Sequence, residues 1–294
     1  MRMKDRTFGS RVFDSVNIAL LFLFGMITLV PFIYIVAGSF TSPEEFISKP
    51  FLLFPTHFSL DGYRYVFSSN IMFRSLGVTV FITVAGTLIN LIFTSLMAYP
   101  LAKKDLDGRR TIMLMVTFSM LFSGGMIPTF LVVKELGLLN SYWSLLLPNA
   151  ISAFNLIVLK NFFQQLPEGL EEAAKIDGCN DMRILWQIVI PLSLPAMATF
   201  TLFYAVGHWN AFFHAVLYIN DNTKWPVQVW LRQIVILSQG GVGDSDAFDS
   251  SYVTPPAQIV KMAVIVVSTI PILCVYPFLQ KHFAKGAMLG SVKG

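Results

Sequence analysis

The sequence predicts an all-α membrane protein with six transmembrane helices, and three observations support this fold class. Charged residues make up 13% of the 294 residues and hydrophobic residues 55%, whereas a soluble domain carries about 25% charged residues. Six charge-free stretches approach or exceed the roughly 20 residues that a helix needs to cross a bilayer. Most Lys and Arg residues lie in alternate segments between these stretches, as in cytoplasmic loops.

The expected spans are residues 16–38, 75–100, 111–133, 142–163, 184–207 and 260–280. The first follows a basic segment, as a signal peptide would. However, its apolar part is longer than the about 7–15 residues of a signal core, so we expect a retained span. The fifth charge-free run is too long for one helix. We expect this helix to end near residues 207–210, with residues 211–219 at the membrane interface.

Proline and glycine mark the positions where these spans can bend. Proline removes a backbone hydrogen bond and can kink a helix. The prolines concerned are Pro128, Pro148, Pro191, Pro195 and Pro271. Gly124 and Gly125 lie in the third span, and the sequence leaves open whether they allow close helix packing or a bend.

The positive-inside rule sets the orientation of the chain. With the N-terminus in the cytoplasm, 14 of the 21 Lys and Arg residues lie on the cytoplasmic side. Both termini are then cytoplasmic, and two long segments, 40–73 and 221–260, lie outside. The net charge of +4 is too small to suggest nucleic acid as a partner. We expect residues 1–294 to form a single transmembrane domain.

One cytoplasmic segment, between the fourth and fifth spans, predicts a short helix at about residues 167–178. Pro167 suits its first turn, Glu171 and Glu172 suit its positive N-terminal end, and Gly178 suits a left-handed end. Asn180 or Asp181 can then cap the fifth span. From composition alone, this segment is either a surface linker or a docking element.

The same segment resembles the EAA motif of ABC importer permeases, E-A-A-x3-G-x9-I-x-L-P. Glu172-Ala173-Ala174, Gly178 and Ile188-Val189-Ile190-Pro191 match its spacing, with Ile190 in place of the usual Leu. The resemblance implies the type I ABC importer permease fold, in which this coupling helix docks on a cytoplasmic ATPase. The coupling positions that it implies are Glu172, Ala173, Ala174, Asp177 and Gly178.

The C-terminal segment, residues 281–294, is similar to the cytoplasmic tail of the smaller permease subunit of maltose-type importers. The residues that it implies as ATPase contacts are Gly290, Ser291, Val292, Lys293 and Gly294. The tail also resembles the branch that imports oligosaccharides and polysaccharides, including alginate oligosaccharides. A frayed basic terminus is the alternative interpretation.

The resemblance implies a set of partners in a bacterial inner membrane. These are a second permease subunit in a heterodimer, an ATPase dimer, an extracytoplasmic solute-binding protein and a carbohydrate substrate. The chain itself lacks the phosphate loop G-x-x-x-x-G-K-[ST], so ATP and Mg are expected to bind to the partner ATPase. We expect a non-catalytic subunit of a multi-pass membrane complex, surrounded by lipid and without nucleic acid.

Polar side chains within or near the spans are candidates for the substrate path. They are Asn90, Asn149, Asn155, Trp209 and Asn210. Each Asn is alternatively a hydrogen-bonding contact between helices, and Trp209 is alternatively an anchor at the membrane interface. In the outer segment 238–256, Asp244, Asp246 and Asp249 are hypothesised to repel an acidic substrate and promote its release.

Two other functional classes compete with an ABC importer permease. A secondary transporter or channel would work without an ATPase, but no Asp, Glu, Lys or Arg lies inside any of the six charge-free stretches. A membrane-embedded enzyme is disfavoured because the chain has neither H-E-x-x-H nor G-x-S-x-G. The four His residues and the two Cys residues have no metal-ligand spacing, so no metal site is expected.

Overall fold

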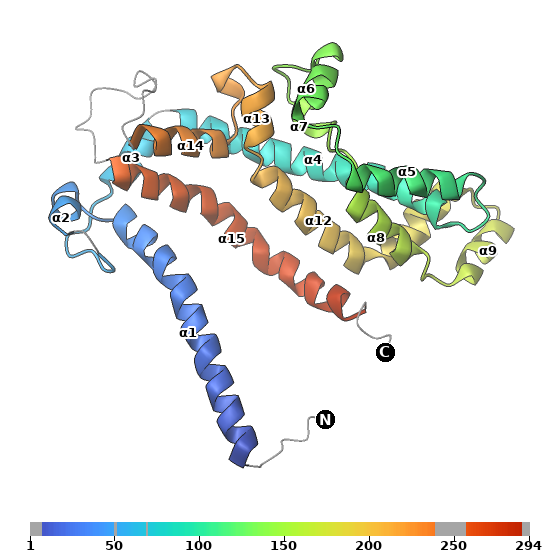
Figure 1. Ribbon diagram of the computed structural model, residues 1–294, viewed down its shortest axis with the longest axis horizontal. Coiled ribbons are helices and arrows are strands. Elements are labelled where there is room, and N and C mark those ends of the chain that lie inside the picture. Colours follow the sequence, from blue (N-terminus) through green and yellow to red (C-terminus); the bar gives the residue numbers. More distant parts are fainter. Residues whose placement is uncertain (1–7, 50–51, 69, 239–256, 290–294) are drawn as a thin grey trace. The chain divides into compact units, whose positions relative to one another are not determined.

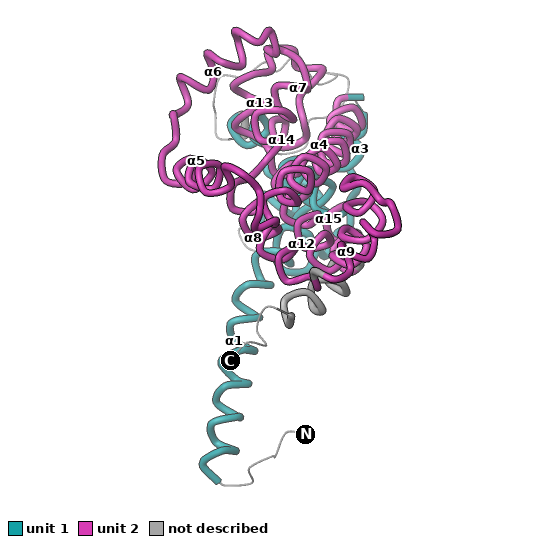
Figure 2. The backbone as a smooth tube through the Cα atoms, turned by 90° about the vertical axis from the view of Figure 1, so that its right-hand side faces the viewer, with its two compact units in different colours: residues 1–70, 231–270 teal, residues 71–230, 271–294 magenta. Residues whose placement is uncertain are grey.

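The computed structural model describes residues 8–49, 52–68, 70–238 and 257–289, with the backbone alone at 168, 237–238, 257 and 278–289. This part of the chain is mostly helical and contains no β-strand beyond one isolated bridge. It divides into two compact units, residues 1–70 with 231–270 and residues 71–230 with 271–294 (Figure 2).

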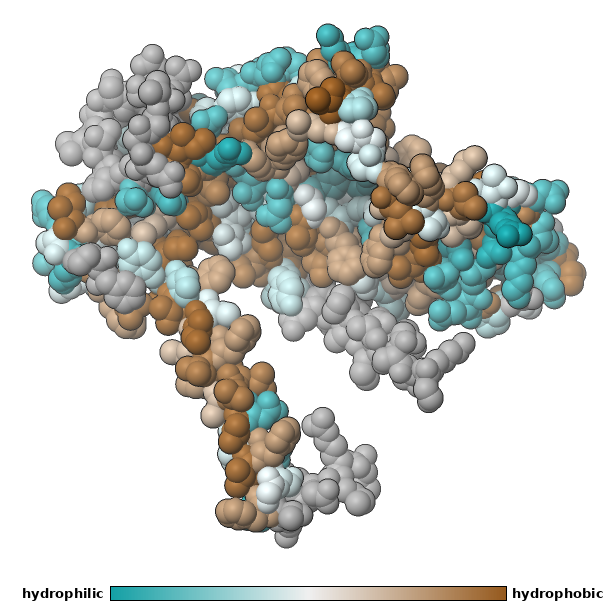
Figure 3. Space-filling model, viewed as in Figure 1, coloured by the Kyte–Doolittle hydropathy of each residue, from teal (hydrophilic) through white to brown (hydrophobic). Residues whose placement is uncertain are grey.

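The first unit contains the long helix α1 (Phe8–Ser39), two short helices, α2 (Pro43–Ser48) and α3 (Asp61–Ser68), and the N-terminal part of α15 (Ala257–Leu289) (Figure 1). Helix α1 is apolar throughout most of its length, and its side chains are exposed until the last turn. Figure 3 shows the apolar surface along this helix. Such a helix is stable in lipid, because hydrocarbon solvates its side chains and the backbone bonds are satisfied internally.

The second unit is arranged along α4 (Asn70–Ala102). Near one end of α4, a buried cluster joins Val78 and Ile82 to side chains of α6 (Met126–Glu135), α7 (Trp143–Leu146), α13 (Phe213–Tyr218) and α14 (Val227–Ser238). Near the other end, a second cluster joins Ala98, Tyr99 and Leu101 to α5 (Arg109–Leu121), α8 (Ala153–Phe163), α9 (Glu168–Ile176) and α12 (Leu194–Trp209).

Two of the expected spans are single long helices in the structure, and a third is the N-terminal part of one. Helices α1, α4 and α15 cover the spans predicted at residues 16–38, 75–100 and 260–280. Among the described residues, three helices are individually long and apolar enough to cross a membrane, and up to five spans result if each sharply bent pair counts as one.

The span expected at residues 111–133 is not continuous. Helices α5 and α6 are bent by 118° across a four-residue break. Gly125 lies in this break at a φ of 90°, which L side chains rarely adopt. The structure therefore shows that the glycine pair makes a bend, one of the two alternatives that the sequence left open.

The fourth expected span, residues 142–163, is also interrupted. Helix α7 ends at Leu146 and α8 begins at Ala153, with Pro148 between them. The backbone carbonyls of Asn149 and Ala150 in this break accept hydrogen bonds from the Asn90 side chain, at 2.6 and 2.9 Å. A break at membrane depth needs such partners because hydrocarbon supplies none.

The fifth expected span bends by 86° at Ser193. It consists of α10 (Asp181–Ile184), the π-helical turn η1 (Leu185–Val189), α11 (Ile190–Leu192) and α12. The π turn ends at Val189, two residues before Pro191. In a regular α-helix, the Pro191 ring would clash with the carbonyl four residues earlier. Helix α12 ends at Trp209, as predicted. The segment after it forms α13, in which Tyr218 is buried whereas Phe213 and Val216 are exposed.

Candidate functional site

The segment that matches the EAA motif forms a short helix, α9, with defined ends. Pro167 is its N-cap rather than its first helical residue. At the other end, the Gly178 amide donates to the Lys175 carbonyl at 3.0 Å, and the Cys179 amide donates to the Ala174 carbonyl at 2.9 Å. This pair of bonds is a Schellman motif, which requires a left-handed residue. Gly178 supplies it with a φ of 80°.

The next helix begins only two residues later. The Asn180 side chain caps α10 by accepting from the Arg183 amide at 2.8 Å. This decides between the two predicted caps in favour of Asn180. The Schellman motif and the cap together fix the direction in which the chain leaves α9 and enters α10.

The inner face of α9 is attached to the end of α4. Ala174 is buried in the cluster that also contains Tyr99 and Leu101. Glu171 forms an ion pair with Lys103 and accepts a hydrogen bond from the Tyr99 hydroxyl at 3.3 Å. The Lys103 ammonium lies 4.5 Å from the centre of the Tyr99 ring. Helix α9 is therefore joined to the end of α4 by both packed and charged contacts.

The charged side chains of this attachment, Lys103 and Glu171, are partly buried. Burial lowers the pKa of the Lys103 ammonium, and the nearby charge of Lys175 lowers it further. Lys175 itself lies 3.5 Å from the Asp181 carboxylate in an exposed ion pair. The Glu171 carboxylate compensates the charge of Lys103, so the pair is stable only when both partners are present.

The outer face of α9 is exposed and mixed in character. Gly169, Glu172, Ala173 and Ile176 have helical spacing that places them on one face, and all four are exposed. The Ile176 side chain is 86% exposed. The exposed face therefore combines the Glu172 carboxylate, the small Ala173 and the apolar Ile176. Figure 3 shows the polar surface that surrounds this end of the second unit.

The structure thus divides the predicted coupling residues. It brings Glu172, Ala173, Asp177 and Gly178 together at the exposed side and end of α9. Ala174 instead packs inside the chain. The sequence analysis did not single out Ile176, although an apolar residue between Lys175 and Asp177 was a usable signal. It also did not anticipate the attachment through Tyr99, Lys103 and Glu171, which are distant in sequence.

The predicted substrate-path residues make different contacts in the structure. Asn90 is buried, and its side-chain oxygen lies 2.5 Å from His208 Nε2 while its amide nitrogen bonds the Asn149 and Ala150 carbonyls. This arrangement is the contact between helices that was the alternative interpretation. Asn149 takes part through its carbonyl only.

The other candidates for the path, Asn155, Trp209 and Asn210, have environments of their own. Asn155 is buried, and its backbone amide meets the Ser152 side chain that caps α8. Trp209 is buried, so the described structure does not place it as an exposed interface anchor, and its indole nitrogen has no hydrogen-bond partner among the described residues. Asn210 is exposed and donates to the Val206 carbonyl at 2.9 Å.

Two predicted features lie outside the described residues. They are the tail residues Gly290, Ser291, Val292, Lys293 and Gly294, and the acidic residues Asp244, Asp246 and Asp249. Their predicted roles remain predictions.

The described residues thus form a helical membrane fold with a short capped helix attached to the end of α4. Residues 107–288 match the family described as the binding-protein-dependent transport system inner membrane component. The chain belongs to this family and is a multi-pass inner-membrane permease component of an ABC importer. The predicted class, non-catalytic role and location are therefore confirmed.

Particular relatives are similar over nearly the whole chain. The polygalacturonan/rhamnogalacturonan transport system permease protein YtcP of Bacillus subtilis is 61% identical over 97% of this chain and 99% of its own length. Protein LplC of the same organism is 58% identical over 98% and 97%. A chain in the crystal structure of a bacterial ABC transporter involved in the import of the acidic polysaccharide alginate is 36% identical, with a TM-score of 0.87, covering 94% of this chain and 98% of that one.

Proposed function

We propose that this chain transmits ATP-driven movement through α9 and carries acidic oligosaccharides across the membrane. The observation that carries the coupling role is the two-sided structure of α9. One side is joined to α4 by Ala174 and by the Glu171–Lys103 ion pair, and the other exposes Ile176 and Ala173. A lever needs both a rigid attachment and a free contact surface.

The partner on the exposed side is a dimeric cytoplasmic ATPase that binds ATP and Mg. Its closure moves α9, and the Glu171–Lys103 contact passes the movement to the end of α4. The spans then face outward and accept a substrate delivered by an extracytoplasmic binding protein, and hydrolysis resets them. Glu172 supplies a charged contact at the docking surface, and Ile176 supplies an apolar one.

The other members of the complex follow from the resemblance of this chain to maltose-type importers. A second, different permease subunit completes the pathway as a heterodimer. The tail residues 290–294 contact the ATPase. The amide and indole groups of Asn149, Asn155, Trp209 and Asn210 are retained as candidates for the path, whereas the contacts of Asn90 favour a structural role.

The substrate class is proposed from the relatives. Polygalacturonan, rhamnogalacturonan and alginate are carbohydrates that carry carboxylates, and they are named for the relatives YtcP and the alginate importer. We therefore infer a uronate-containing oligosaccharide for this chain. A neutral oligosaccharide is the second candidate, because a 30% identical relative from Streptomyces coelicolor is a diacetylchitobiose uptake permease.

The coupling role is tested with the complete complex in proteoliposomes, by measuring ATP hydrolysis and uptake together. Glu172→Lys and Ile176→Asp alter the exposed face of α9, and Gly178→Val disrupts its end at a cost of about 1–2 kcal/mol. Each variant is expected to lower uptake at least about tenfold, equivalent to about 1.4 kcal/mol of coupling. The membrane content of the chain is expected to be unchanged.

Glu135→Lys is the matched control for Glu172→Lys, because Glu135 is an exposed carboxylate at the end of α6. It should leave ATP hydrolysis and uptake unchanged. Wild-type coupling in all three α9 variants would contradict the proposed role of this helix.

The substrate class is tested separately, through stimulation of ATP hydrolysis by the loaded binding protein. Oligogalacturonides and alginate oligosaccharides are compared with neutral oligosaccharides of equal length. Stimulation by the neutral sugars alone would overturn the acidic substrate and leave the coupling role of α9 intact.

A further inference from the structure

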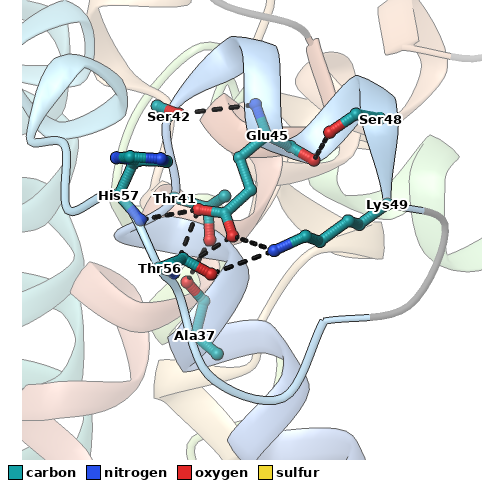
Figure 4. A network of polar contacts seen from close by, with 8 residues as sticks. All are labelled: Ala37, Thr41, Ser42, Glu45, Ser48, Lys49, Thr56 and His57. Carbon is teal, nitrogen blue, oxygen red and sulfur yellow. Dashed lines mark hydrogen bonds and ion pairs between the residues drawn. The ribbon is translucent and has the colours of Figure 1, made fainter.

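The loop that follows α1 has a fixed shape because its backbone is folded around one buried carboxylate. Glu45 Oε1 lies 2.8 Å from Lys49 Nζ, and Glu45 Oε2 accepts from the His57 amide at 2.8 Å. The Thr56 amide donates to the same carboxylate at 3.0 Å. Figure 4 shows these groups converging on Glu45. Residues 42–49 and 52–60, which we call the span-end loop, are therefore held together by charge-assisted bonds.

The span-end loop is also held at the end of α1. The helix ends at Ser39, and two residues later Thr41 forms an antiparallel bridge with Phe58. The Ser42 amide donates to the His57 carbonyl at 3.2 Å, and the Ser59 amide donates to the Phe40 carbonyl at 2.9 Å. Since α1 is an apolar span, these contacts fix the loop at the depth where the hydrocarbon core ends.

Large apolar side chains project from this loop. Ile47, Phe54 and Phe58 are 76%, 81% and 76% exposed, whereas Leu52 is buried. Exposed apolar residues that occur singly on a protein surface are normal, but a group on one short loop marks an interaction surface. The Phe58 ring contacts the Phe40 ring, with 5.9 Å between their centroids, and most of the Phe58 surface still remains exposed.

We propose that the span-end loop inserts Ile47, Phe54 and Phe58 into the membrane interface at the C-terminal end of α1. The occupant of this surface is lipid, because the loop is continuous with the exposed apolar surface of α1. Phe32, Ile33 and Val36 carry that surface to within one turn of the end of the helix.

Such an anchor has a mechanical consequence. Apolar side chains inserted into the interface resist displacement along the membrane normal. The loop joins α1 to α3, so the insertion holds this connection at a constant depth. The inference does not depend on the substrate or on the ATPase, because it follows from the loop and the span alone.

The test is the depth of spin labels in the complete complex, reconstituted in liposomes. Single labels are placed at Ile47→Cys, Phe54→Cys and Phe58→Cys in a Cys179→Ser, Cys274→Ser background. Collision with membrane-dissolved oxygen is compared with collision with a water-soluble nickel chelate. The collision rate of the chelate with labels at these positions is expected to be about tenfold lower than at a water-exposed site, equivalent to about 1.4 kcal/mol.

Two reference sites calibrate the measurement. Val36→Cys reports the apolar end of α1, and Arg64→Cys reports an exposed charged position on α3. Labels at positions 54 and 58 that resemble the Arg64→Cys label would overturn the proposal. Labels that are accessible to the chelate, and become protected only when the loaded binding protein is added, would overturn it in favour of a protein-docking surface.

A second comparison tests whether Glu45 holds the anchor. Glu45→Gln removes the buried charge, and Glu44→Gln is the matched control because Glu44 is exposed on the same helix. With the label at position 58, Glu45→Gln is expected to raise chelate collision severalfold, and Glu44→Gln is expected to leave it unchanged. Equal collision rates in both variants would show that Glu45 does not hold the loop in place.

Discussion

At the scale of single residues, the structure assigns Asn90 to helix contacts. Its side chain contacts His208 on α12 and donates to two backbone carbonyls in the break between α7 and α8. The break needs partners that lipid does not provide, and Asn90 provides them. His208 can approach because residue 86 is glycine, where a Cβ would lie 2.5 Å from the imidazole ring.

We predict that Gly86→Ala destabilises the chain by displacing His208 from Asn90. The lost contacts correspond to about 1–2 kcal/mol within a membrane. Thermal unfolding in detergent measures this change. In a His208→Ala background, Gly86→Ala should cost much less, because the ring that it would strike is absent. An equal cost in both backgrounds would show that the imidazole is not the obstacle.

Glu45 gives a second residue-scale prediction, this time for pH. Its bonds with Lys49, the Thr56 side chain and the His57 amide lower the pKa of the carboxyl from 4.5 to about 2. A depressed pKa in the folded state means that ionisation stabilises the span-end loop above pH 4.5. This stabilisation is expected to be lost as the pH falls from 4.5 towards 2.

Hydrogen exchange at the Thr56 and His57 amides measures this loss, after correction for the intrinsic exchange rate at each pH. In the wild-type chain, local opening should increase over that interval. Glu45→Gln should open more readily at neutral pH and show little further change on acidification. An unchanged wild-type response in Glu45→Gln would assign the pH dependence to another group.

At the scale of the element, the coupling proposed for α9 depends on its attachment to α4 as much as on its exposed face. We predict that Lys103→Glu and Glu171→Lys each reduce uptake, because each leaves a charge of the partly buried pair without its partner. The double variant should recover part of the loss, with a coupling energy of about 1 kcal/mol. Uptake in proteoliposomes measures this double-mutant cycle, and additive losses would show that the pair is not coupled.

At the scale of the whole molecule, the chain exposes apolar surface that only a bilayer and further subunits can cover. Side chains along α1, α5 and α6 are largely exposed. We predict that this chain alone, in liposomes with an ion gradient, gives no uptake of oligosaccharide. Uptake should require the ATPase, the second permease and the binding protein together. Gradient-driven uptake by the isolated chain would favour a secondary transporter.

The sequence was most informative where composition alone decides the structure. The spans at residues 16–38, 75–100 and 260–280 are found within helices α1, α4 and α15. The end of α12 and the left-handed Gly178 were also predicted correctly. Long apolar runs and helix-end residues act through local chemistry, so neighbouring residues in the sequence suffice to identify them.

The sequence was less informative where the role of a residue depends on distant partners. A charge-free run shows that a segment is apolar, but it does not show whether the backbone is continuous, so the breaks at Gly125 and Ser193 needed the structure. Asn90 had two alternative roles, and its partners on α12 and in the α7–α8 break, more than 50 residues away, favour the helix contact. The resemblance implied Ala174 as a coupling position, and the structure adds that it is buried in a cluster with residues of α4.

The sequence by itself determined that this protein is a multi-span membrane protein, because long apolar runs are a property of local composition, and its resemblance to the EAA motif implied the permease family. Only the tertiary structure decided which side of α9 is free and which is attached. It also decided that the loop after α1 is folded around Glu45 and exposes Phe54 and Phe58. The physical reason is that burial and ion pairing are set by contacts between remote segments, and no local pattern contains them.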